Sequence, residues 1–168
     1  MFFIASRRLL LAAIISIFSQ ASLAGPNHSM SADIGKPGEG SPSRTIRIVM
    51  YDNYYDVEKV DIQPGETVRF SVVNEGQLVH EFNIGTEAMH LAHAPEMLMM
   101  VEHGVLKPDS IDQAAAEAMQ KSMGHGKHDD PNSVLLEPGK TGELVWTFDG
   151  QSAEKIQFAC NVPGHLDA

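Results

Sequence analysis

Three side chains of this sequence have the types and the order of a metal-binding set. His80 lies in the segment VHEFNIG, and Cys160 and His165 lie near the C-terminus in FACNVPGH, where Pro163 and Gly164 form a turn between them. Two imidazoles and one thiolate make a trigonal set that suits both Cu(I) and Cu(II), as in blue copper sites. Structural zinc normally takes four ligands, often from paired cysteines, and the sequence has one cysteine. The sequence therefore predicts a single copper ion held by His80, Cys160 and His165.

Each of these residues also has an ordinary structural role when it is considered alone. A lone inward histidine on a strand is most often a core residue with satisfied hydrogen bonds. A lone cysteine after a strand is usually a small buried hydrophobe. The spacing of Cys160 and His165 across one tight turn, together with an inward His80, favours the metal site over these separate roles.

Short segments with alternating apolar residues must position the three side chains. The alternation predicts strands over residues 45–52, 68–72 and 78–84, and the apolar residues Val57, Val60 and Ile62 predict another over residues 57–62. Turns are expected at Pro64-Gly65 and at residues 74–76. The C-terminal part repeats the arrangement of strand, Pro-Gly turn and strand in LLEPGKTGELVWTF, and EKIQFAC is also strand-like. His80 shares its side of the strand with Leu78, Phe82 and Ile84, so it should point inward. These features predict an all-β, antiparallel β-sandwich.

Residues 85–133 interrupt this pattern and form a partly helical insertion. Ser110 and Gln113 have the spacing of a capping box, AAAEAMQKSM consists of good helix formers, and Gly124 can end the helix. An earlier helix is predicted to begin at Pro95 and to stop at Gly104.

The insertion is rich in histidine and methionine. In a helix, His90, His93 and Met97 would share one face, where they could form a secondary copper site. The alternative is that the methionines fill gaps where a helix packs on the sheet. His125 and His128 lie in the charged stretch MGHGKHDD and are expected to be exposed, where they either capture metal weakly or are only solvated.

The segments PGETVRFSVVN, VHEFNIG and FACNVPGH resemble those of the cupredoxins, the family of plastocyanin and azurin. The resemblance covers roughly residues 45–84 and 135–168, and it implies a Greek-key sandwich with His80, Cys160 and His165 as equatorial copper ligands. It also implies a preformed apolar shell that lets copper change oxidation state with little movement. The sequence as a whole, with the histidines and methionines of its insertion, is most similar to periplasmic cupredoxins of copper tolerance.

The end of the chain departs from the family pattern. Cupredoxins usually place an axial methionine five residues after the second histidine and then a final strand, and that position would be 170, whereas the sequence ends at Ala168. Because GHLDA is similar to the beginning of the family's ending, we expect a sequence that lacks its C-terminal strand. The alternative is a site without the usual axial group.

The N-terminal residues are predicted to direct export. Arg7 and Arg8 precede the apolar run LLLAAIISIF, and small residues follow, which is typical of a signal peptide over residues 1–24. The run is short for a membrane span of about 20 residues. Residues 25–43 are rich in Gly, Pro and Ser and predict a flexible arm, and residues 44–168 form the cupredoxin domain. The expected location is the periplasm, without stable membrane insertion.

The composition narrows the functions further. A formal net charge of −10 argues against nucleic acid as a partner, because such binding depends on Lys and Arg. We expect a monomeric copper-binding protein that buffers copper in copper tolerance or passes single electrons, with copper ions and a redox or copper-handling protein as partners and no substrate turnover. The alternatives are an electron carrier for a respiratory or oxidase partner, a subunit of a copper enzyme such as a nitrite reductase or multicopper oxidase, and a purely structural sandwich.

Overall fold

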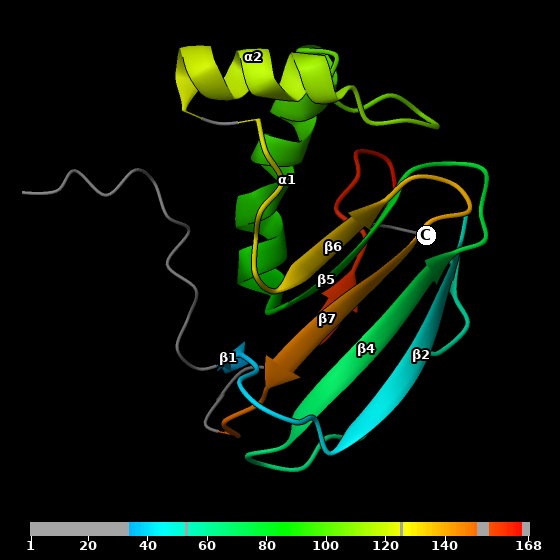
Figure 1. The fold of residues 1–168 in the computed structure, drawn as a ribbon, viewed down its shortest axis with the longest axis vertical. Helices are drawn as coiled ribbons and strands as arrows, with labels where there is room; N and C mark the ends of the chain where they lie inside the picture. The colour runs from blue at the N-terminus through cyan, green and yellow to red at the C-terminus, as the bar shows by residue number, and fades with distance from the viewer. Residues whose placement is uncertain (1–33, 53, 125, 151–154, 166–168) are drawn as a thin grey trace, which may run out of the picture.

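Two β-sheets pack face to face in the computed structural model, which describes residues 34–52, 54–124, 126–150 and 155–165 (Figure 1). The larger sheet has the strand order β1-β7-β4-β2-β3, and the smaller sheet has the order β6-β5-β8. The strands are β1 (Lys36–Pro37), β2 (Arg44–Tyr51), β3 (Tyr54–Tyr55), β4 (Thr67–Asn74), β5 (His80–Gly85), β6 (Ser133–Leu136), β7 (Thr141–Thr147) and β8 (Gln157–Ala159). The expected cupredoxin-like β-sandwich with a helical insertion is confirmed.

One strand pairing differs from the purely antiparallel arrangement that the sequence predicted. β2 and β4 are parallel, with Ile46 opposite Phe70, whereas the other ladders are antiparallel. The predicted strand over residues 57–62 is also wrong, because this segment has no strand structure. Its apolar residues do not alternate strictly, and they pack against the core as a loop. Since this loop returns the chain to the end at which β2 began, β4 must run in the same direction as β2.

The core lies between the sheets, and β5 is the most buried strand. Phe82 and Ile84 of β5 pack against Phe70 and Trp146 of the larger sheet, as the alternation predicted. The opposite face of β5, which carries Glu81 and Asn83, is buried as well. Helix α1 (Glu87–Glu102) contacts β5 and covers this second face. Both faces of β5 are therefore inside the protein.

The insertion forms two helices beside the smaller sheet (Figure 1). α1 begins at Glu87 rather than at Pro95, since Thr86 caps it by accepting a hydrogen bond from the N–H of Met89. Its end at Glu102, just before Gly104, agrees with the predicted glycine stop. α2 (Gln113–Met123) ends at Gly124 as predicted, but its N-cap is Asp112 and not Ser110.

The last part of the predicted flexible arm is built into the sandwich. Ile34 is fully buried in the core, its carbonyl accepts a hydrogen bond from the indole N–H of Trp146, and β1 pairs with β7. The prediction of an arm is therefore wrong for residues 34–37. The predicted signal peptide over residues 1–24 lies outside the described residues. Within the described part of the chain, neither helix has the length and apolar character needed to cross a membrane.

Candidate metal centre

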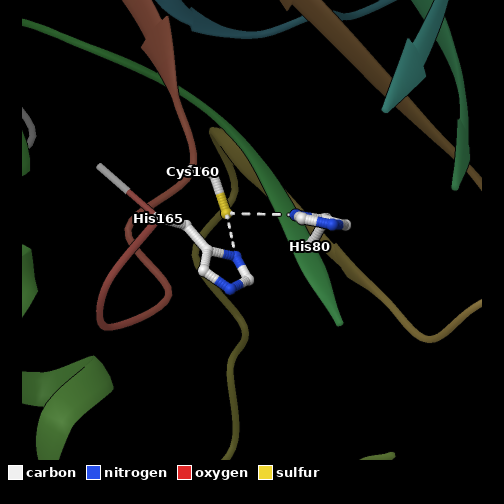
Figure 2. Close-up of side chains that lie close together, drawn as sticks. All are labelled: His80, Cys160 and His165. Carbon is white, nitrogen blue, oxygen red and sulfur yellow. Dashed lines mark hydrogen bonds between the residues drawn. The ribbon is translucent and has the colours of Figure 1, made fainter. Parts of the chain in front are cut away.

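The structure brings His80, Cys160 and His165 together at one end of the smaller sheet (Figure 2). His80 is the first residue of β5 and lies on the same face as Phe82, as the alternation predicted. Cys160 directly follows β8, which pairs with β5. The turn after Cys160 is closed by a hydrogen bond from the N–H of His165 to the carbonyl of Val162. This turn returns the second imidazole to the thiol.

The Cys160 sulfur is the centre of the group. Its Sγ lies 3.8 Å from Nδ1 of His80 and 3.6 Å from Nδ1 of His165, and both rings direct that nitrogen toward the sulfur (Figure 2). The two rings are 4.8 Å apart and tilted by 39°. The thiol is 8% exposed, and His80 is 3% exposed. Two imidazole nitrogens and one sulfur in a buried pocket fit a copper ion by the chemistry of the donor set.

Electrostatics favour neutral side chains at this site in the metal-free protein. Burial raises the pKa of Cys160 to about 11, against the opposing effect of hydrogen bonds from the backbone amides of Glu81 and Val162. Burial and the nearby charge of His80 lower the pKa of His165. The thiol therefore has to release a proton when a metal binds, whereas a neutral imidazole is ready to donate its lone pair.

Asp52 is a residue of this site that the sequence analysis missed. Its Oδ1 lies 3.1 Å from Nε2 of His80 and accepts hydrogen bonds from the N–H groups of Gln77 and Leu78. A carboxylate can only accept, so the proton of His80 lies on Nε2 and the lone pair of Nδ1 faces Cys160. No motif marks Asp52, because it lies 28 positions before its partner and at the end of another strand.

The cavity next to the three residues carries aromatic side chains. It is lined by Met50, Tyr51, Asp52, Tyr54, Tyr55, His80, Cys160 and His165. Among these lining residues, Met50 contributes a thioether sulfur-containing side chain. Met97 and Met100 lie instead in an apolar cluster with Val79, as the packing alternative for the methionines expected.

Glu81 is the second residue that the sequence analysis missed, and it is fully buried. Its Oε1 accepts hydrogen bonds from His93 and His128 at 3.2 and 2.7 Å, and its Oε2 accepts from the backbone and side chain of Asn161. Burial by itself would raise the pKa of Glu81, but the hydrogen bonds from His128 and His93 hold it well below its ordinary value. The alternation of β5 placed Glu81 opposite His80, but it gave no sign that another element covers that face.

The members of the predicted secondary site have different partners. His90, His93 and Met97 do share the buried face of α1, as their spacing predicted. His93 reaches Glu81, whereas Met97 packs among apolar side chains. The side chain of His128, which we expected to be exposed, is only 6% exposed, because it closes over Glu81. Copper binding by His90, His93 and Met97 together stays a prediction.

Comparisons with known proteins assign the family. No protein-family model matches the chain. The chain is 45% identical over 176 residues to a copper-resistant cuproprotein, CopI, of Pseudomonas aeruginosa, with 96% of this chain and 93% of that protein covered. Proteins of the same name from Rubrivivax gelatinosus and Vibrio cholerae are 36% and 32% identical, with 84% and 82% of this chain and 72% and 68% of those proteins covered.

A solved structure of auracyanin B is similar at a TM-score of 0.48 and 16% identity, over 80% of this chain and 91% of that one. The assignment follows from the three sequence relatives, each more than 30% identical along more than two thirds of its length. The chain belongs to the family of CopI copper-resistant cuproproteins.

Proposed function

We propose that this protein acts in copper tolerance in the periplasm and holds one copper ion at a type 1 site formed by His80, Cys160 and His165. The observation that carries the proposal is the convergence of two Nδ1 atoms on one buried sulfur, at 3.8 and 3.6 Å. The relatives support it, since they are named copper-resistant cuproproteins. The proposed location depends on the export signal predicted over residues 1–24.

Residues around the site hold its side chains in the form that binds copper. Asp52 holds the proton of His80 on Nε2, so that Nδ1 is free to bind. The N–H of Glu81 donates to the Cys160 sulfur at 3.3 Å and stabilises the thiolate form. Burial excludes water from the sulfur. Copper, when bound, supplies a one-electron couple, and a rigid donor set allows that couple to work with little rearrangement.

Sequestration and electron transfer use the same three residues. His165 is only partly buried, and this exposure favours electron transfer to a docked partner as the second candidate function. We propose that the protein turns over no substrate, because multicopper enzymes commonly build further copper centres with His-x-His pairs and this sequence has none.

The decisive experiment is an absorption spectrum with metal analysis of the copper-loaded protein. We expect an intense thiolate-to-copper band that is lost in Cys160→Ala, and weaker copper binding with an altered spectrum in His80→Ala and His165→Ala. His103→Ala is the matched control, because His103 is exposed and outside the site. A band of full intensity in Cys160→Ala would refute the type 1 site.

Growth experiments separate the two roles of that site. A deletion strain that is sensitive to copper but respires normally, and that is rescued by the wild type and not by Cys160→Ala, would support tolerance. A respiratory defect without copper sensitivity would support electron transfer.

A further inference from the structure

We propose that Glu81, His93 and His128 form a second metal site, which takes one divalent first-row cation. The cluster lies on the face of β5 opposite His80, so this site is separate from the type 1 site. The identity of the ion as Cu(II) rests on the proposed function. The donor set itself would also accept Zn(II).

The donor atoms already have the spacing of ligands to one ion. Oε1 of Glu81 lies 3.2 Å from Nε2 of His93 and 2.7 Å from Nε2 of His128, and all three atoms are within 4.8 Å of one another. Ligands with bonds of about 2.0–2.1 Å to one metal are separated by similar distances. The two rings are 5.4 Å apart and inclined by 64°, so both can direct Nε2 at one point without stacking. Oε1 of Glu81 also accepts hydrogen bonds from Ser133 and Asn83 at 2.7 and 3.1 Å. A cation would therefore take the place of the two Nε2 protons, which are lost when it binds, after small shifts of the side chains.

Two buried polar groups next to the cluster lack well-formed hydrogen bonds, and they are the second observation. Asn161 is 3% exposed and its amide donates to Oε2 of Glu81 at 2.7 Å, whereas its side-chain oxygen makes no well-formed hydrogen bond and interacts with the His90 ring. His90 is 4% exposed, and its ring interacts with the backbone of Gln157 and the side chain of Asn161 without a well-formed hydrogen bond. Buried polar atoms are rarely left unpaired unless an ion or water completes them. A bound cation with its water would complete both groups.

Two carboxylates connect the cluster to the surface. Oε2 of Glu96 and Oδ2 of Asp130 lie 3.5 and 3.9 Å from Nδ1 of His93, and their side chains are 22% and 27% exposed. Carboxylates behind ligating imidazoles orient the rings and strengthen their donor character. Their partial exposure also gives a cation a negatively charged entrance. The cluster is also an internally hydrogen-bonded network, but such a buried ion network is often no more stabilising than apolar side chains of the same volume.

The two sites are joined by covalent neighbours. Glu81 follows His80, and Asn161 follows Cys160, so one ligand of each site is adjacent in the chain to a group of the other. The N–H of Glu81 donates to the Cys160 sulfur, and the N–H of Asn161 donates to Glu81. A cation at the second site would therefore shift the absorption of copper bound at the first.

Titration of the full-length variant Cys160→Ala/His165→Ala with Cu(II) isolates the second site. We expect one Cu(II) whose electron paramagnetic resonance spectrum shows two imidazole nitrogens, without a thiolate band. Adding His93→Gln and His128→Gln should weaken this binding by more than about tenfold, whereas adding the control His103→Gln should not. Equal affinity with and without the His93 and His128 substitutions would overturn the proposal.

A second measurement does not require the variant with all four substitutions to fold. Pulsed electron paramagnetic resonance of the Cys160→Ala/His165→Ala protein should count two coupled imidazoles, and a count of one or none would overturn the second site. The two proposals can fail separately. In the protein that retains Cys160 and His165, His93→Gln/His128→Gln should keep the thiolate-to-copper band. Absence of that band in the wild type, with Cu(II) still bound by the isolating variant, would refute the type 1 site and leave the second site standing.

Discussion

At the scale of single residues, Asp52 determines how His80 faces Cys160. One oxygen of Asp52 accepts hydrogen bonds from Nε2 of His80 and from the backbone amides of Gln77 and Leu78. It therefore fixes both the tautomer of the ring and the loop that leads into β5. Burial by itself would raise the pKa of Asp52, but the hydrogen bonds from His80 and the two amides together lower it below its ordinary value. The carboxylate is thus ionised when the site is assembled.

We predict that Asp52→Ala lowers copper affinity by about 10- to 100-fold, the usual cost of removing a partner of a metal ligand. The thiolate-to-copper band should persist, because Cys160 is unchanged. Asp52→Asn is the matched control, since its amide oxygen can still accept from Nε2, and it should lose less affinity. Copper competition titrations measure both variants, and equal affinity in wild type and Asp52→Ala would contradict the positioning role.

Both oxygens of the Glu81 carboxylate accept hydrogen bonds from buried groups. We predict that Glu81→Gln destabilises the metal-free protein by roughly 3–5 kcal/mol, since it leaves buried imidazoles without their counter-charge. Glu143→Gln is the matched control: Glu143 faces Arg69 at 3.7 Å on the surface and should contribute at most about 1 kcal/mol. Urea unfolding of both variants tests the difference, and equal losses would contradict it.

At the scale of elements, β5 and α1 work as one unit. β5 presents His80 to one face and Glu81 to the other, and α1 carries His93 across to Glu81. The start of α1 sets where His90 and His93 lie, and that start depends on the hydroxyl of Thr86, which accepts from the N–H of Met89 at 3.3 Å.

We predict that Thr86→Ala destabilises the protein by about 1 kcal/mol, the typical cost of losing a helix N-cap. Thr86→Ser keeps the hydroxyl and should cost less. Denaturant unfolding gives the free energies. If both variants lost the same free energy, the buried methyl group of Thr86 and not its hydroxyl would be the stabilising feature.

At the scale of the whole molecule, buried titratable groups make stability depend on pH. Burial lowers the pKa of His93, but hydrogen bonds with Glu81 and Glu96 outweigh this and raise it to about 10. A raised folded-state value means that the stability from His93 is complete below its ordinary pKa of 6.5 and is lost as the pH rises toward 10. The raised pKa of Cys160 acts in the same direction above pH 9, where the unfolded thiol ionises first. Burial lowers the pKa of His90 and His165, so their effect is a loss of stability below 6.5.

We therefore predict that the metal-free protein is most stable near neutral pH and that its free energy of unfolding falls between pH 7 and 10. His93→Gln should flatten the alkaline side of this profile, because the glutamine does not titrate. Urea unfolding in the presence of a chelator, at intervals from pH 5.5 to 10, measures the profile. A free energy that stays constant from pH 7 to 10 would contradict the prediction.

Local features of the sequence were enough to predict most strands, the glycine residues that end the helices and the inward direction of His80. These depend on short-range periodicity and on turn chemistry, which the sequence states directly. The five-position spacing of Cys160 and His165 belongs to the same class, because one turn determines the distance between them. The family resemblance then placed His80 with them, and the structure brings the three side chains together.

Only the tertiary structure decided the features that join distant segments. The parallel pairing of β2 and β4 depends on the path of the loop between them, the tautomer of His80 depends on Asp52 from another strand, and the burial of Glu81 depends on the insertion that covers it. Alternation along β5 predicts that Glu81 faces away from His80, but it cannot predict whether water or a helix lies on that side. That outcome is set by packing between residues separated by tens of positions, and no local pattern records it.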